Sequence, residues 1–134
     1  MDKLSPNARS ENMRRIKSKG MKPEMVVRRL VHKSGYRYRL HRRDLPGKPD
    51  LVFSSKKKAI FVHGCFWHQH SACPEGRVPG SNQDYWKAKL ERNVARDAAQ
   101  IAKLTAEGWS VLVIWECQTK DIQGAEKLLR RFLR

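Results

Sequence analysis

Residues 50–63, DLVFSSKKKAIFVH, hold two β-rich runs on either side of a polar turn that is rich in lysine. The runs DLVF and KAIFVH consist largely of the branched and aromatic residues that strands favour, so we expect an antiparallel hairpin. With the turn centred near Lys56, Asp50 lies opposite Val62, and His63 lies beside them. The hairpin therefore predicts that a carboxylate, a strand-end carbonyl and an imidazole meet at one end of a sheet.

A helix and a strand are expected before this hairpin. The segment 22–35, KPEMVVRRLVHKSG, has Pro23 and Glu24 in its first turn and stops at Gly35, which is typical of a helix. The segment 36–41, YRYRLH, alternates ring and charge as a half-buried strand does. The first twenty residues lack an apolar face, and we interpret them as an arm.

After the hairpin we expect a helix, a strand and a helix. The segment 81–108 predicts a long helix, opened by Ser81 with Asp84 three residues on and closed by a glycine. The segment 109–117, WSVLVIWEC, predicts a strand buried on both faces, and 124–134 predicts a last helix. The fold class expected for these 134 residues is one α/β domain with a mixed sheet, spanning the whole chain.

One carboxylate interrupts the apolar stripe of the long helix. The stripe has helical spacing and consists of Trp86, Leu90, Val94, Ile101 and Leu104. Asp97 falls inside it, and a buried carboxylate is costly unless something pairs with it, so Asp97 should have a specific partner. A salt bridge to Arg92 or Arg96 is the ordinary alternative.

The charge is strongly positive and is spread along the chain. Lysine and arginine total 29 against 13 acidic residues, which gives a net charge of +16 and a pI near 10.4. Such an excess attracts polyanions, with nucleic acid as the leading candidate, and a well-solvated basic surface is the alternative. We see no transmembrane run and no secretory signal, so a cytoplasmic protein is expected.

Three cysteines and two histidines suggest a metal site. Cys65, Cys73 and Cys117 cannot all pair within the chain, which favours metal ligation over disulfides. Together with His70 they make a closed tetrahedral zinc site that leaves no coordination position free for catalysis. His68 is the competing imidazole, and three buried reduced cysteines are the alternative.

Asp50 is a candidate metal ligand of a second kind. It follows a proline at the start of a strand, and candidate ligands lie eleven to thirteen residues later on the partner strand. Restriction-type nucleases use this spacing to hold Mg²⁺ against a phosphate, although they usually carry an acid and a lysine where this chain has Phe61 and His63. Because Pro-Asp before a strand is common, the pattern alone is weak.

Phe66 and Trp67 are adjacent aromatic residues beside the candidate zinc ligands. Rigid apolar side chains that enter between base steps unstack a duplex, so the pair is a candidate wedge. A hydrophobic cover over the edge of the core is the ordinary interpretation.

Taken together, these segments resemble the very-short-patch (Vsr) mismatch repair endonucleases from about residue 9 to residue 117. The resemblance is carried by RSENMRRIKSKGMKPE, RYRLHRRDLPGKPDLVF, AIFVHGCFWHQH, YWKAKLERNVARD and GWSVLVIWEC. The order of FVHGCFWH, ARD and WEC is highly specific. Two departures are HQHSAC, which lacks a longer histidine run, and Gly20-Met21, where many relatives have an Asp-Thr pair.

The resemblance implies a restriction-endonuclease-like fold that nicks one strand of duplex DNA, 5′ to the thymine of a T·G mismatch. Such mismatches arise when 5-methylcytosine deaminates. It also implies that Asp50 binds a catalytic Mg²⁺ together with the main-chain carbonyl of Val62. Glu24 and His63 would then support the hydrated metal or the phosphate.

The resemblance further implies that His68 is the general base for the attacking water and that Asp97 orients it. The structural zinc would be held by Cys65, His70, Cys73 and Cys117. The residues that enter the DNA would be Phe66, Trp67 and Trp86 from the major groove and Met13 from the minor groove.

The implied partners are double-stranded DNA with a T·G mismatch, then mismatch-repair proteins and a DNA polymerase downstream. We expect a monomer in the prokaryotic cytoplasm, since a two-fold dimer suits a palindromic cut in both strands. Two other functions stay open. One is a restriction-type endonuclease that cuts both strands, and the other is an inactive, zinc-stabilised DNA-binding module.

Overall fold

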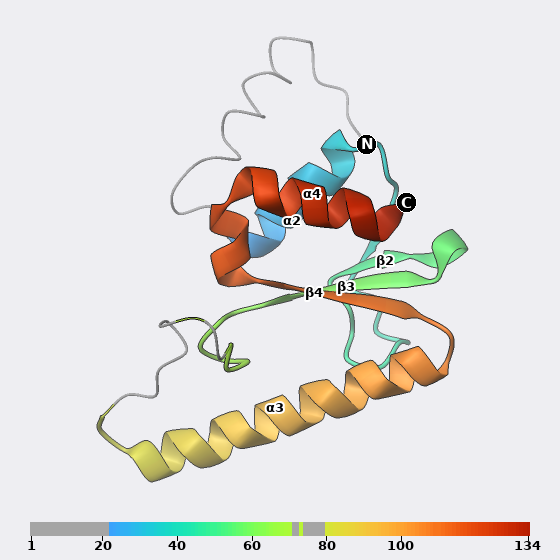
Figure 1. Cartoon of the computed structure of the whole chain (residues 1–134). Coiled ribbons are helices and arrows are strands. Elements are labelled where there is room, and N and C mark those ends of the chain that lie inside the picture. Colours follow the sequence, from blue (N-terminus) through green and yellow to red (C-terminus); the bar gives the residue numbers. More distant parts are fainter. Residues whose placement is uncertain (1–21, 71–72, 74–79) are drawn as a thin grey trace.

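A computed structural model describes residues 22–70, 73 and 80–134, in which a mixed sheet carries helices on both faces (Figure 1). The helices are α2 (Pro23–Lys33), α3 (Gln83–Ala106) and α4 (Ile122–Leu133), and the shorter 3₁₀ helices are η1 (Ser54–Lys56) and η3 (Glu116–Lys120). Helices α2 and α4 lie on one face of the sheet and α3 lies on the other. The expected arm, with Met13, lies outside the described residues.

Four strands run in the order β1-β2-β3-β4 across the sheet. They are β1 (Arg39–Leu40), β2 (Leu51–Phe53), β3 (Lys58–His63) and β4 (Ser110–Trp115). β2 pairs antiparallel with both β1 and β3, whereas β3 and β4 are parallel and are connected through α3. The expected hairpin and the expected mixed α/β architecture are therefore confirmed.

The register of the hairpin differs by one residue from the sequence prediction. Leu51 pairs with Ile60, so the ladder continued by one position sets Asp50 opposite Phe61 and not opposite Val62. The physical reason is the turn, in which η1 is followed by one left-handed residue with a φ of 51°. This loop has an even number of residues, and its centre therefore lies between two residues and not on one.

Three further expectations differ at the ends and edges of elements. The strand expected over 36–41 is limited to β1. The long helix begins after Asn82 and not at Ser81, because Asn82 is left-handed, with a φ of 54°, and makes no capping hydrogen bond. β4 is an edge strand of the described sheet and only Ile114 in it is fully buried, so the expected burial on both faces is wrong.

Two apolar clusters form the core, one against each group of helices. Leu30 of α2 and Leu129 of α4 pack with Ile60 of β3. The next residue of that strand, Phe61, packs in the other cluster with Leu104 of α3. Successive side chains of a strand point to opposite faces, so β3 holds the two layers together. No helix within the described ranges combines the length and the apolar character needed to cross a membrane.

The apolar stripe of α3 is only partly buried, which makes a test of the core possible. Leu90 is 2% exposed, whereas Val94, about one turn later, is 41% exposed. Leu90→Ala should lower the free energy of unfolding by about 2–5 kcal/mol, since it removes buried methyl groups and leaves a cavity. Val94→Ala should lower it by less than about 1 kcal/mol. Urea unfolding followed by circular dichroism measures both, and equal losses would contradict the difference in burial.

Candidate active site

Side chains of the types that can bind a metal form three clusters in the described part of the chain, each with its donor atoms within 4.8 Å of one another. The carboxylate cluster consists of Glu24, His41 and Asp50. The imidazole cluster consists of His63, His68 and Asp97. The cysteine cluster consists of Cys65, His70, Cys73 and Cys117.

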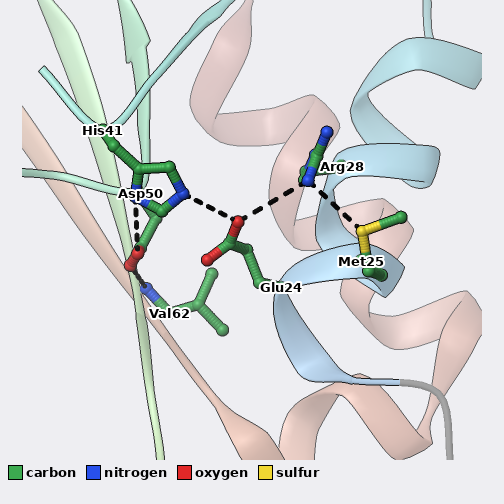
Figure 2. Close-up of polar contacts among 6 residues, drawn as sticks. All are labelled: Glu24, Met25, Arg28, His41, Asp50 and Val62. Carbon is green, nitrogen blue, oxygen red and sulfur yellow. Dashed lines mark hydrogen bonds and ion pairs between the residues drawn. The ribbon is translucent and has the colours of Figure 1, made fainter.

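The carboxylate cluster joins the start of α2 to the end of the β1–β2 ladder (Figure 2). Nε2 of His41 lies 3.1 Å from Oε2 of Glu24, and its Nδ1 lies 3.8 Å from Oδ1 of Asp50. The other carboxylate oxygen of Asp50 accepts the backbone N–H of Val62 at 2.7 Å. The strand-end meeting of Asp50 and Val62 is therefore present, although the contact runs through the N–H.

The electrostatics of this cluster favour a cation. Burial raises the pKa of the Asp50 carboxyl, and the negative charge of Glu24 raises it further. The N–H of Val62 and the nearby His41 act in the opposite direction. Because two half-buried carboxyl groups repel each other when ionised, a divalent ion between them relieves the repulsion. Their oxygens are the donors that Mg²⁺ prefers, so the cluster can hold a hard cation.

His41 is the member of this cluster that sequence reasoning misses. It ends the run YRYRLH and resembles any polar residue beyond a strand. The signal that could have found it is strand register, since its backbone N–H donates to the carbonyl of Asp50 at 3.2 Å. Pairing that run with the start of β2 would have brought the imidazole next to the carboxylate.

In the imidazole cluster, a carboxylate on α3 meets a histidine from the loop after β3. Nδ1 of His68 lies 2.5 Å from Oδ2 of Asp97. An ionised carboxylate only accepts, so Nδ1 carries the hydrogen and Nε2 keeps its lone pair. Arg96, the ordinary alternative partner, donates instead to Asn93. An imidazole held in one tautomer in this way can take a proton from water.

His63 lies against His68, whereas the sequence predicts it beside Asp50. The two imidazole rings are stacked, with centroids 3.8 Å apart and an angle of 8° between their planes. The imidazole that faces Asp50 is His41. Burial lowers the pKa of His63 to about 4, the charge of His68 contributes to the fall, and Asp97 opposes it. His63 is therefore neutral at pH 7.

The donor atoms of the cysteine cluster meet where β3 and β4 end. Nδ1 of His70 lies 3.8 Å from Sγ of Cys65 and 3.4 Å from Sγ of Cys117. Cys73 completes the group. Burial raises the pKa of the Cys65 thiol to about 12, so a thiolate at this position needs a cation beside it. Three sulfur donors and one imidazole nitrogen are a set that suits a tetrahedral divalent metal.

Trp115 connects the cysteine cluster to the imidazole cluster. Its ring is stacked on His70, with centroids 4.3 Å apart, and it meets the His63 ring in a T-shaped arrangement with centroids 5.3 Å apart. His63 is in turn stacked on His68. The segment that carries His68 and His70 is therefore held by ring packing on His63 and on Trp115, so its position depends on both clusters.

An aromatic group lies on the surface next to these clusters. The ring centroids of Phe66, Trp67 and Trp86 lie 5.0–5.8 Å from one another, and the Trp67 residue is 46% exposed. Sequence reasoning misses Tyr85, which is 58% exposed and packs on Trp86. The ammonium of Lys89 lies over the rings of Trp67 and Tyr85. Exposed rings with a positive charge among them are suited to stacking on nucleic-acid bases.

Comparison with known proteins connects this geometry to a family. The family model described as DNA mismatch endonuclease Vsr matches residues 1–74. The chain is 51% identical over 132 residues to the type II nicking enzyme V.XorIIP of Xanthomonas oryzae pv. oryzae, which covers 98% of this chain and 96% of that protein. It is 39% identical over 120 residues to the DNA mismatch endonuclease Vsr of Escherichia coli, covering 90% of this chain and 74% of that protein.

These similarities identify the chain as a DNA endonuclease. Within that class, the chain belongs to the Vsr family. Another relative, the type II nicking enzyme V.NmeAIP of Neisseria meningitidis, is 40% identical over 133 residues and covers 99% of this chain and 94% of its own. The carboxylate and imidazole clusters are therefore the candidate active site of an endonuclease.

The low pKa of His63 predicts how stability depends on pH. The unfolded chain binds a proton at His63 near pH 6.5, whereas the folded chain binds it only near pH 4, so stability falls as the pH drops through this window. The expected slope is at most about 1.4 kcal/mol per pH unit. His63→Phe keeps a ring on His68 without the titration. Urea unfolding across the window should show a steeper loss in the wild type, and parallel losses would contradict the assignment.

Proposed function

We propose that this endonuclease depends on Mg²⁺ and nicks one strand of duplex DNA, 5′ to the thymine of a T·G mismatch left by deamination of 5-methylcytosine. The observation that carries the proposal is the pairing of His68 with Asp97 in a protein that also has a carboxylate cluster and exposed rings. One relative is named a mismatch endonuclease and others are named nicking enzymes. These names support recognition of a mismatch and cleavage of one strand. The mixed sheet is compatible with the restriction-endonuclease-like fold that we assign with this function.

Asp50 and the main-chain carbonyl of Val62 are the protein ligands that we propose for Mg²⁺. The bound ion supplies Lewis-acid stabilisation of the charge that develops on the phosphate. The N–H of Val62 holds one oxygen of Asp50, so the other faces His41 and the rest of the cluster. Glu24 lies across the cluster, and we propose that it and His63 hold water or phosphate oxygens around the site.

His68 is the proposed general base. Its Nδ1–H is bound by Asp97, so Nε2 is the atom that accepts a proton from the attacking water. Asp97 orients the ring and stabilises the imidazolium that forms. The stacked His63 is neutral at pH 7 and therefore adds no positive charge that would oppose this protonation.

Zinc is the metal that we propose for the cysteine cluster, with a structural role. Cys65, His70, Cys73 and Cys117 offer the sulfur and imidazole donors that a closed tetrahedral zinc site requires. The ion would join the segment after β3 to η3. Because His68, Phe66 and Trp67 lie in that segment, zinc would hold them in position without entering the reaction.

The exposed aromatic group is the proposed contact with mismatched DNA. Phe66, Trp67 and Trp86 would enter from the major groove and Met13 of the arm from the minor groove, with Lys89 near the phosphates. A T·G pair stacks less well than a matched pair, so opening the duplex there costs less. The net charge of +16 supports strong non-specific attraction to DNA, on which this selection acts.

We further propose that the whole chain acts as one domain and as a monomer, because a single T·G mismatch is asymmetric. Its DNA substrate would be met in the prokaryotic cytoplasm. The nicked strand would pass to mismatch-repair proteins and a DNA polymerase.

Nicking of a labelled duplex with one T·G pair tests the proposed reaction. With Mg²⁺ we expect one cut, 5′ to the mismatched thymine, and none with a metal chelator or on fully paired DNA. Asp50→Asn should slow the cut by at least about 100-fold, and Asp97→Asn by about 100-fold to 10,000-fold. Asp44→Asn is the matched control, since Asp44 is an exposed carboxylate paired with Arg42.

Two outcomes would contradict the proposal. Cleavage of both strands of paired DNA would identify a restriction-type enzyme. Binding of the mismatched duplex without any cleavage, under every metal tested, would identify a DNA-binding module.

Metal analysis tests the proposed zinc site. Protein prepared without chelators should carry about one zinc per chain, and removing the zinc should lower the melting temperature, because metal binding contributes to folding. Cys117→Ser should lose zinc, whereas Asp97→Asn, outside the cysteine cluster, should keep it. Emission spectrometry and thermal unfolding measure both effects, and wild-type protein without zinc would refute the site.

A further inference from the structure

We propose that one ring nitrogen of His41 is a ligand of the cation that Asp50 binds, and that Glu24 accepts a hydrogen bond from the other ring nitrogen. The inference rests on the proposed metal-dependent nicking and adds a ligand and a metal preference to that site. The two proposed Mg²⁺ ligands, Asp50 and Val62, lie just before β2 and on β3. His41 lies on neither strand and directly follows β1.

The hydrogen bond to Glu24 determines which nitrogen of His41 is available. Nε2 lies 3.1 Å from a carboxylate oxygen of Glu24, which only accepts, so Nε2 carries the hydrogen. The neutral ring then has its lone pair on Nδ1. That atom faces Oδ1 of Asp50 at 3.8 Å. This distance is too long for a hydrogen bond, but it suits two ligand atoms that bind the same metal ion. Metal-binding histidines commonly donate their other N–H to a carboxylate in this way.

The backbone keeps the ring of His41 at this place. β1 ends one residue earlier, and His41 has a φ of 51°, in the left-handed region that residues with a side chain rarely adopt. Its N–H donates to the carbonyl of Asp50 at 3.2 Å, which ties the two residues together across the ladder. The side chain is 51% exposed, so a hydrated ion and a phosphate can reach it.

A nitrogen ligand changes which ion the site prefers. Mg²⁺ strongly prefers oxygen donors, whereas Mn²⁺ and Co²⁺ also accept imidazole. A site built from Asp50 and His41 should therefore bind Mn²⁺ more tightly than Mg²⁺. Replacing the imidazole should weaken Mn²⁺ binding by about tenfold, and Mg²⁺ binding by less.

Two substitutions remove the nitrogen lone pair, and each keeps an amide near a different ring nitrogen. His41→Gln places an amide near the position of Nε2, so it can keep the bond to Glu24. His41→Asn places an amide near the position of Nδ1 and tolerates the left-handed backbone, but it does not reach Glu24. Neither side chain has a nitrogen lone pair. His32→Gln is the matched control, because His32 is an exposed histidine on α2 outside the three clusters.

Mn²⁺ is the probe, because its electron spin echo is modulated by a directly bound nitrogen. The frozen complex of isotope-labelled protein, Mn²⁺ and a T·G duplex should show histidine nitrogen coupling in the wild type and in His32→Gln. Both His41 variants should lose it and bind Mn²⁺ about tenfold more weakly in a spin-resonance titration. Thermal unfolding shows whether each variant is folded. If one variant does not fold, the other variant provides the test.

The outcomes separate this inference from the proposed function. A wild type that nicks T·G DNA but shows no histidine coupling, or coupling that persists in both His41 variants, overturns the role of His41 alone. Failure of the wild type to bind Mn²⁺ also overturns it. A wild type that shows the coupling but cuts no T·G duplex supports the ligand and refutes the proposed reaction.

Discussion

Parallel pairing of β3 with β4 is the constraint on which the rest of the site depends. The register sets His63 beside Trp115, and two parallel strands leave a sheet at the same edge. The segment after β3 and the 3₁₀ helix after β4 are therefore neighbours, although about fifty residues separate them in sequence. This neighbourhood brings Cys65 to Cys117 and lets the ring of Trp115 lie on His70. A shift in that pairing would displace the cysteine cluster and the imidazole cluster together.

A second theme is the placement of the few acidic groups in a basic chain. Glu24, Asp50 and Asp97 are all partly buried, where an ionised carboxylate is costly without a partner. Each has one, namely the His41 imidazole for Glu24, the backbone N–H of β3 for Asp50 and the His68 imidazole for Asp97. These three negative charges therefore lie where a cation or a fixed tautomer is needed. The remaining surface stays positive and attracts DNA.

Local patterns were sufficient to predict most of the elements. The hairpin, α2 and α3 all follow from periodicity and from end signals such as Pro23, because each depends on residues close in sequence. The same patterns could not predict strand register or edge position. The parity of the loop after β2 decides what lies opposite Asp50, and the partners of β4 decide how far it is buried. Both depend on contacts between segments that are distant along the chain.

The candidate site divides in the same way. The chemistry of each side chain is written in the sequence, so the three cysteines with one of two nearby histidines, and the need of Asp97 for a partner, could be named from spacing and from the cost of burying charge. Nothing local predicts that His41 rather than His63 faces Asp50, because that outcome depends on the ladder between β1 and β2 and on a left-handed residue at its end.

The sequence by itself determined the basic surface, the order of helices and strands, the ligand types and the resemblance to a family that the comparisons confirm. Only the tertiary structure decided which imidazole joins which cluster and which nitrogen of an imidazole is left available. The physical reason is range. Composition and periodicity act within a few residues of chain, whereas a cluster with donors within 4.8 Å of one another forms only after separate strands and helices have packed.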